Sequence, residues 1–232
     1  MEKRGRSVVL VSGGMDSLVA AALAVRETDA AFLHVSYGQR TEARERLAFR
    51  AIADHYRIER RLEVPLPALG AIGGSALTDP SIPIRTDGID RSSIPASYVP
   101  FRNAHLVALA VSWAEVQGAV SVHIGAVEED SSGYPDCRAA FFEALGEAVR
   151  IGAAGGESIR IVAPLIKMTK REIVRLGLEL GAPFELSWSC YVGGETACGA
   201  CDSCRLRLRA FRENGVPDPI PYAPGTPGGG PG

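Results

Sequence analysis

The stretch that decides the fold is Ser7-Val8-Val9-Leu10-Val11-Ser12-Gly13-Gly14-Met15-Asp16-Ser17, which an alanine-rich run from Leu18 to Val25 follows. An apolar run, a glycine pair and a helix-forming run in this order predict a short strand that turns into a helix. Glycines let the backbone approach a ligand closely, and the free amides at a helix N-terminus favour an anion. The stretch therefore predicts a phosphate-binding site, with an ordinary strand-to-helix turn as the alternative.

The residues of the glycine turn also indicate which kind of phosphate loop this is. A GTPase-type loop needs a lysine in the pattern G-x-x-x-x-G-K-[ST], and the turn has none. The turn instead resembles the S-G-G-x-D-S pyrophosphate loop of enzymes that split ATP into AMP and pyrophosphate. The residues expected to contact ATP are Leu10, Val11, Ser12, Gly13, Gly14, Met15, Asp16, Ser17 and Leu18.

Composition limits the class of protein. The chain has 232 residues, of which 46% are apolar and 22% charged, with a net charge of −2. Such a chain can bury a full core, and its near-neutral charge argues against a large nucleic-acid-binding face. It shows neither a signal-peptide core nor an apolar stretch long enough to span a membrane. We therefore expect a cytoplasmic protein with no nucleic-acid or membrane partner, and a small nucleotide-like substrate is compatible with this composition. The oligomeric state stays open, a homodimer included.

Strand-like and helix-like runs alternate along the chain. After the first strand, strands are expected at 30–36, 60–64, 119–125 and 159–163, and helices at 41–56, around 106–116 and at 138–149. This alternation predicts an α/β fold with a doubly wound parallel sheet, similar to a Rossmann fold. In such sheets the ligand lies at the carboxyl ends of the strands, where the winding direction reverses.

The same pass along the chain predicts three regions. Residues 1–183 form an ATP-binding α/β domain, residues 184–216 a zinc-binding region, and residues 217–232 a tail rich in proline and glycine. We expect this tail to be disordered, since it has little apolar surface to bury. Inside the first region, the segment from Pro65 to Pro100 is rich in Gly, Pro and Ser, and a loop of this length is expected to be functional or mobile.

A second local pattern, Thr169-Lys170-Arg171-Glu172, has the spacing of a capping box and predicts a helix start. Lys170 then lies in the first turn, where the helix dipole disfavours a cation. Its position indicates either an anionic partner or a solvated surface lysine.

Four of the five cysteines follow the spacing C-x7-C-x2-C-x2-C, at Cys190, Cys198, Cys201 and Cys204. In a reducing compartment such cysteines are metal ligands or catalytic groups more often than disulfides. Four thiolates make a closed tetrahedral zinc site, so we expect one structural Zn²⁺ per chain, with a redox C-x-x-C pair as the alternative. The arginine-rich run 205–211 predicts a short helix that either helps to bind nucleic acid or is a solvated basic face.

From Val8 to Pro219 the chain resembles the QueC family, the 7-cyano-7-deazaguanine synthases of queuosine biosynthesis. The matching strings, besides the glycine turn and the cysteines, are Tyr37-Gly38-Gln39-Arg40, Gly74-Ser75-Ala76-Leu77-Thr78-Asp79, Tyr98-Val99-Pro100-Phe101-Arg102-Asn103, Ser132-Gly133-Tyr134-Pro135-Asp136-Cys137-Arg138, Ala163-Pro164-Leu165, Thr169-Lys170 and Glu185-Leu186-Ser187-Trp188-Ser189-Cys190. Two places depart from the family pattern: Phe101 stands where alanine is expected, and 126–129 replaces a segment that usually contains asparagine.

The resemblance implies a carbon–nitrogen ligase that uses ATP with Mg²⁺ to convert 7-carboxy-7-deazaguanine and ammonia into the nitrile. Asp16 is then expected to bind Mg²⁺ or to order the loop, and Lys170 and Arg102 to neutralise phosphate charge. Residues expected to bind substrate are Tyr37, Gln39, Arg40, Asn103, Asp130, Ser132, Gly133, Tyr134 and Asp136. For Asp136 we expect contact with the guanidine-like edge of the substrate, or a helix N-cap, or both.

Three other functions stay open at this stage. A tRNA thiolase of the same superfamily would need catalytic cysteines, and only Cys137 lies outside the predicted zinc site. A noncatalytic zinc-dependent binding protein is the second, and a relative that conjugates the deazapurine to a protein is the third. Cys137 itself is expected to be a packed thiol, since no step of the implied chemistry needs a nucleophile.

Overall fold

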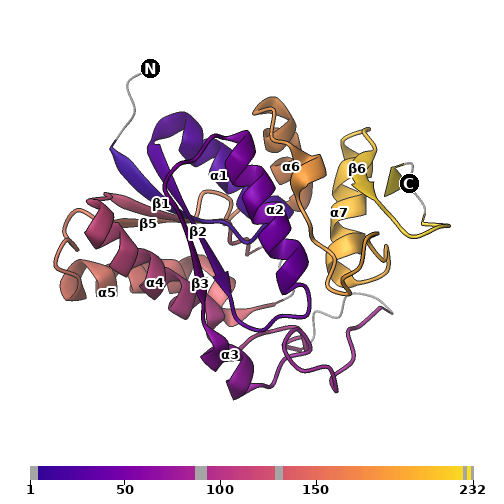
Figure 1. Ribbon diagram of the computed structural model, residues 1–232, viewed down its shortest axis with the longest axis horizontal. Helices are drawn as coiled ribbons and strands as arrows, with labels where there is room; N and C mark the ends of the chain where they lie inside the picture. Colours follow the sequence, from indigo (N-terminus) through magenta and orange to yellow (C-terminus); the bar gives the residue numbers. More distant parts are fainter. Residues whose placement is uncertain (1–4, 87–92, 129–132, 227–228, 231–232) are drawn as a thin grey trace.

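A computed structural model of the chain describes residues 5–86, 93–128, 133–226 and 229–230. Its centre is a parallel sheet with the strand order β3-β2-β1-β4-β5 (Figure 1). The strands are β1 (Arg6–Leu10), β2 (Asp29–Ser36), β3 (Arg61–Pro65), β4 (Ser121–Ile124) and β5 (Arg160–Val162). The predicted doubly wound parallel sheet is confirmed, with each strand within two residues of its expected bounds.

The two faces of the sheet bury separate apolar clusters, because alternate side chains of a strand point to opposite faces. Val9 and Phe32 pack against α1 (Met15–Glu27) and α2 (Glu42–His55). Val8 and Leu33 pack against α4 (Arg102–Gln117) and α5 (Ala139–Gly152). Both faces are covered, which explains why the strands are apolar throughout instead of alternating with polar residues.

The winding direction reverses at β1, which lies between β2 and β4. The chain moves from β1 outward to β2 and β3 on one side, then crosses to β4 and β5 on the other. The loops that follow β1, β2 and β4 therefore meet at one edge of the sheet. This is the place where the sequence predicts a ligand.

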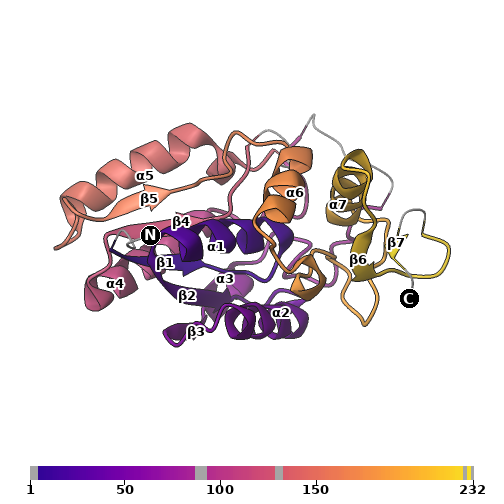
Figure 2. The same cartoon turned by 90° about the horizontal axis from the view of Figure 1, so that it is seen from above.

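The remaining helices extend the fold beyond the sheet. Figure 2 shows α6 (Lys170–Glu179) between α1 and α7 (Asp202–Glu213), with β6 (Asp218–Pro221) on the far side of α7. Among the described residues, no helix is both long enough and apolar enough to cross a membrane.

The long segment between β3 and α4 is partly structured. It contains α3 (Pro67–Ile72), and three of its side chains, Leu69, Leu77 and Val99, bury Tyr37 in a small apolar cluster. Residues 87–92 lie outside the described part of the chain. The described part of this segment therefore forms a wall beside the end of β2.

The expectation of a disordered tail is wrong for residues 217–226. Asp218 is fully buried and accepts two hydrogen bonds from the guanidinium of Arg207, at 2.7 and 2.9 Å. Ile220 and Tyr222 are buried beside the cysteines, and β6 pairs with β7 (Gly229–Gly230). A buried charge needs a partner of this kind, and low apolar content alone does not reveal it.

The same ion pair corrects the interpretation of the arginine-rich run as a solvated basic face for Arg207, whereas Arg205 is exposed and Arg209 is partly exposed. Arg207 is 1% exposed and also donates to Ser187 and to the carbonyl of Phe184. Phe184 begins the short helix η2 (Phe184–Leu186). Arg207 therefore joins α7, the tail and the segment that leads to the first cysteine.

Candidate active site

The glycine turn after β1 forms a compact loop at the start of α1. Gly13 has a φ of +90°, and a Cβ there would lie 2.7 Å from the carbonyl oxygen of Glu45, so only glycine fits. The Ser17 hydroxyl donates to the carbonyl of Gly14 at 2.9 Å, and the Ser12 hydroxyl donates to Ser17 at 3.1 Å. The loop therefore holds its backbone amides and hydroxyls together at the helix N-terminus, an arrangement that suits an anion.

Lys170 reaches this loop from a distant part of the sequence. The predicted capping box is present at the start of α6, and the Nζ of Lys170 lies 2.6 Å from Oδ2 of Asp16. The lysine is only 9% exposed, so the reading as a solvated surface residue is wrong. The anionic partner in this structure is Asp16, whose other oxygen, Oδ1, is buried and has no hydrogen-bond partner within the described residues.

Gly125 packs closely against the backbone of the loop, and no role at the site was expected for it. It follows β4, and a Cβ at this position would lie 2.7 Å from the amide nitrogen of Ser17 and 2.8 Å from the carbonyl carbon of Asp16. The only available signal was a glycine at the end of a predicted strand, which is typical of a close backbone approach.

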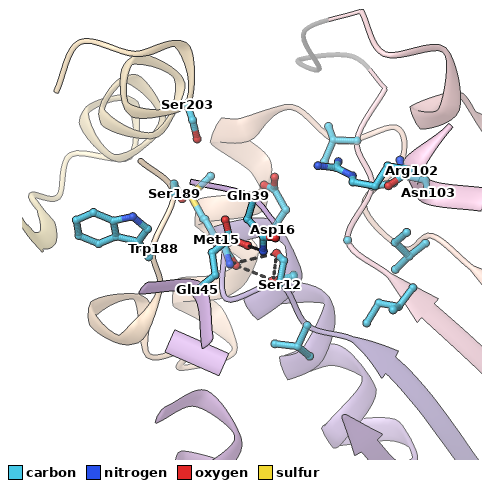
Figure 3. A pocket seen from close by; sticks show the side chains of 18 of the residues that line it. Ser12, Met15, Asp16, Gln39, Glu45, Arg102, Asn103, Trp188, Ser189 and Ser203 are labelled. Carbon is cyan, nitrogen blue, oxygen red and sulfur yellow. Dashed lines mark hydrogen bonds between the residues drawn. The ribbon is translucent and has the colours of Figure 1, made fainter. Parts of the chain in front are cut away.

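A cavity of about 270 Å³ opens beside the loop at the carboxyl ends of the strands (Figure 3). Predicted site residues in its wall are Leu10, Val11, Ser12, Gly14, Met15, Asp16, Ser17, Tyr37, Gln39, Arg102, Asn103, Tyr134 and Lys170. Predicted residues that do not line it are Gly13, Leu18, Arg40, Gly133 and Asp136. Asp130 and Ser132 lie outside the described residues. The fold thus brings together most of the predicted residues, whose roles stay predictions.

Arg102 begins α4 and faces Tyr37 across the cavity wall. Its Nη1 donates to the hydroxyl of Tyr37 at 3.0 Å, and its Nε is buried without a partner within the described residues. Burial lowers the pKa of Arg102, but its interactions with Tyr37, Tyr134 and Cys137 together raise that pKa by more, so the guanidinium stays charged. For Tyr37, burial has the opposite effect: it raises the pKa, so the phenol stays neutral.

Asp136 is not among the residues that line the cavity, and its expected contact with the substrate stays a prediction. It lies in the short helix η1 (Pro135–Cys137), and its Oδ2 accepts from the backbone amide of Asn103 at 2.9 Å. It therefore caps the N-terminus of α4 rather than that of the following helix, α5. A cap from a distant segment leaves no local pattern, so the sequence pointed to the wrong helix.

Cys137 is a packed thiol, as expected. It is 7% exposed, and the side-chain amide of Asn103 donates to its sulfur at 3.2 Å. Burial raises the pKa of Cys137 to about 11, against the lowering effect of Arg102. The thiol is therefore protonated at neutral pH and is a poor nucleophile.

Arg40 also lies outside the cavity wall, and its expected role in binding substrate stays a prediction. Its guanidinium donates to the backbone carbonyls of Asp79 and Ile82, each at 2.7 Å. These bonds connect the segment between β3 and α4 to the loop that follows β2.

Several residues in the cavity wall were not expected from the sequence. They are Leu33, Val35, Thr41, Glu45, Leu77, Leu106, Ile124, Gly125, Ala126, Val127, Cys137, Trp188, Ser189, Cys190, Tyr191, Ser203, Leu206 and Arg207. Of these, Trp188 contacts the loop directly, since its backbone amide donates to the carbonyl of Gly13 at 2.8 Å. The segment before the cysteines is therefore part of the site.

The four cysteines predicted to bind zinc do lie together. Their sulfur atoms are all within 4.8 Å of one another, and those of Cys198 and Cys204 are 3.9 Å apart. Sulfurs about 2.3 Å from a zinc ion at tetrahedral corners would be roughly 3.8 Å apart. Backbone amides of Val192 and Cys198 donate to the sulfur of Cys190, as they would to a thiolate. The donor set and its surroundings fit a structural metal ion.

Comparison with known proteins agrees with this geometry. The family model described as "Queuosine biosynthesis protein QueC" matches residues 6–215. The chain belongs to the QueC family. A relative from Koribacter versatilis (strain Ellin345), named 7-cyano-7-deazaguanine synthase, is 60% identical over 95% of this chain and 94% of its own. A relative of the same name from Chlorobaculum parvum (strain DSM 263 / NCIMB 8327) is 56% identical over 94% and 96%.

Among solved structures, NMN synthetase from Francisella tularensis is a distant likeness, with a TM-score of 0.46 and 15% identity over 92% of this chain and 78% of that chain. Membership of the QueC family instead rests on the match that spans the glycine turn, Lys170 and the four cysteines.

Proposed function

We propose that this chain is an ATP-dependent 7-cyano-7-deazaguanine synthase, which converts 7-carboxy-7-deazaguanine and ammonia into the corresponding nitrile. The observation that carries the proposal is the identity of 60% with a synthase over 95% of the chain. The phosphate loop, with Lys170 and Asp16 in contact beside it, supports the ATP chemistry.

The reaction must convert an oxygen of the substrate into a leaving group twice, first in the carboxylate and then in the amide. A carboxylate is a poor electrophile, so its oxygen first attacks the α-phosphorus of ATP and pyrophosphate leaves. Ammonia then attacks the carbonyl carbon of the mixed anhydride, and AMP leaves with one carboxylate oxygen to give the amide. The amide oxygen then attacks the α-phosphorus of a second ATP, and pyrophosphate leaves again. Loss of both protons from the amide nitrogen, and departure of AMP with the former amide oxygen, form the C≡N bond. Both adenylations therefore use the same two parts of the site, one that binds the phosphates of ATP and one that binds the deazapurine.

Residues of the loop would bind the departing pyrophosphate. The hydroxyls of Ser12 and Ser17 and the first amides of α1 are donors fixed before the substrate binds, and such donors stabilise developing charge most strongly. Lys170 and Arg102 are the two cations in the described cavity wall besides the buried Arg207. In the proposal they neutralise phosphate charge during transfer, and Lys170 leaves Asp16 to do so.

The proposal includes Mg²⁺ with ATP and one structural Zn²⁺. The unpartnered Oδ1 of Asp16 is a hard oxygen donor beside the phosphate loop, which suits Mg²⁺. The four clustered cysteines suit zinc, which would stabilise the segment that carries Trp188. Free thiols held for a metal fit a reducing compartment, so the proposal also includes a cytoplasmic location.

Specific contacts argue against the two alternative functions, a tRNA thiolase and a nucleic-acid-binding protein. A thiolase would need Cys137 as a sulfur carrier, yet this thiol is buried and accepts a hydrogen bond from the side-chain amide of Asn103. The arginines expected to favour nucleic acid are engaged within the chain: Arg207 is buried against Asp218, and Arg205 donates to the carbonyls of Ala200 and Thr86.

The test is incubation of the protein with 7-carboxy-7-deazaguanine, Mg-ATP and an ammonium salt, followed by mass spectrometry of the base and the adenine nucleotides. The proposal predicts the nitrile together with AMP and pyrophosphate. A folded, metal-loaded protein that leaves both the acid and ATP unchanged would refute it.

A further inference from the structure

Gln39 and Glu45 form a fixed pair in the cavity wall. Gln39 follows β2 and is 4% exposed, and Glu45 lies in the first turn of α2. The backbone amide of Tyr37 donates to Oε1 of Gln39 at 2.8 Å, and Nε2 of Gln39 donates to Oε2 of Glu45 at 2.9 Å. Since only an oxygen accepts from the Tyr37 amide, these two bonds determine which way the Gln39 amide points.

The pair keeps hydrogen-bonding capacity for a ligand. Thr41 donates to Oε1 of Glu45 at 2.5 Å, so each carboxylate oxygen accepts one bond from the protein and can accept another. The Gln39 amide has a second hydrogen on Nε2. Since Gln39, Thr41 and Glu45 all line the cavity (Figure 3 labels Gln39 and Glu45), the wall presents a donor followed by two acceptors.

Glu45 is also the carboxylate in the cavity wall that is best placed to accept hydrogen bonds from a ligand. Among the described residues of the cavity wall, the carboxylates are Asp16 and Glu45. Asp16 is in contact with Lys170 beside the phosphate loop, and Asp136 caps α4 outside the cavity. Of these carboxylates, Glu45 is the one that lines the cavity away from Lys170, whereas Asp136 is held at the start of α4.

We propose that Gln39 and Glu45 read the guanine-type edge of the deazapurine acid, an inference that rests on the proposed synthase function. That edge presents, in order, the O6 acceptor, the N1–H donor and the 2-amino donor. Nε2 of Gln39 donates to O6, and the two oxygens of Glu45 accept from N1–H and the 2-amino group. Bonds to a charged acceptor in this bidentate form are both strong and directional.

The same pattern rejects an adenine-type edge. Adenine presents its amino group to Nε2 of Gln39, which places one donor against another. It also presents an unprotonated N1 to the carboxylate of Glu45, which places one acceptor against another. Discrimination is sharpest where a site leaves its own polar groups unpaired with the wrong ligand. Glu45 is thus a specificity residue, and Thr41 and Gln39 hold its carboxylate in position.

The experiment compares kcat/KM for 7-carboxy-7-deazaguanine with that for the analogue lacking the 2-amino group, in the wild type and in Glu45→Gln. The wild type should prefer the natural acid by at least about 10-fold, since one bond to a charged group is lost with the analogue. In Glu45→Gln the preference should shrink to within roughly threefold, while the KM for ATP stays unchanged. The control is Glu42→Gln, which removes the same charge from the same turn of α2 away from the cavity and should keep the wild-type preference.

Three results would overturn the inference. They are an unchanged preference in Glu45→Gln, an equal loss on both substrates, and a raised KM for ATP with the preference intact. If Glu45→Gln does not fold, as judged by thermal melting, the wild type with an N1-methylated acid decides, because turnover of that analogue contradicts a bond at N1. A wild type that turns over neither substrate refutes the synthase function itself, which separates the two failures.

Discussion

The cavity wall is built from two sets of residues that the chain encodes in different ways. The phosphate set consists of Ser12, Gly14 to Ser17, Gly125, Lys170 and Arg102; the recognition set consists of Gln39, Glu45, Asn103 and Tyr134. The first is mainly one continuous motif fixed by backbone geometry, whereas the second is assembled from loops and helices that only the fold brings together. Backbone geometry tolerates few residues at a position, so we expect the phosphate set to be more sensitive to single substitutions.

The largest effect should come from the metal site, because it supports both sets at once. Cys201→Ser should lose the metal, melt at a lower temperature and retain less than about a thousandth of the activity, since binding free energy at such sites is folding free energy. Metal analysis and thermal melting check this. Cys137→Ser is the matched control, since it changes the one cysteine outside the cluster and should keep the metal. A stable, metal-free and active Cys201→Ser protein would contradict the account.

Lys170→Met tests the phosphate set directly. It removes a buried cation and leaves Asp16 without its partner, so kcat/KM for AMP formation should fall by roughly 10²–10³, as for loss of one preorganised charged donor. Lys167→Met removes an exposed lysine nearby and should be close to wild type. Equal activities of the two variants would remove Lys170 from the mechanism.

Gly125→Ala tests the support of the loop without touching a polar group. The added methyl would lie 2.7 Å from the Ser17 amide nitrogen, so the loop must move, and the loss in kcat/KM should approach about 10². Gly146→Ala in α5, where a Cβ meets nothing within 4 Å, is the control. If the two alanine variants behave alike, the close approach of β4 to the loop has no functional consequence.

The smallest effect should come from Cys137, a residue of the cavity wall that belongs to neither set. Cys137→Ser keeps a partner for the amide of Asn103, so kcat/KM should stay within about fivefold of the wild type. Because burial raises the pKa of Cys137 to about 11, its alkylation should remain slow until the pH approaches that value. Loss of activity in this variant, with the protein folded, would favour the thiolase reading.

The sequence predicted those features whose determinants are close together in the chain. The glycine turn, the capping box at Thr169 and the cysteine spacing each carry a local pattern, and the structure contains all three elements. The alternation of strands and helices was sufficient for the parallel sheet, and with it for the edge at which the ligand cavity opens.

The remaining features depend on contacts between distant segments. Asp136 caps a helix that begins 34 positions earlier in the chain, and Asp218 orders the tail through its ion pair with Arg207. Glu45 lies in α2, after the predicted site residues Tyr37 to Arg40, and its side chain lines the same cavity. A lone acidic residue on a helix or in a proline-rich tail has no spacing that reveals its partner. Such residues therefore become interpretable only after the fold is known.

One measurement tests most directly whether the two sets act on one substrate. With 7-carboxy-7-deazaguanine labelled with ¹⁸O in both carboxylate oxygens, adenylation of the acid and then of the amide predicts that both labels appear in AMP, one in each AMP molecule formed. Mass spectrometry of the nucleotides reads this out. Unlabelled AMP, or label recovered in inorganic phosphate or water, would contradict transfer of AMP to the oxygen of the bound deazapurine.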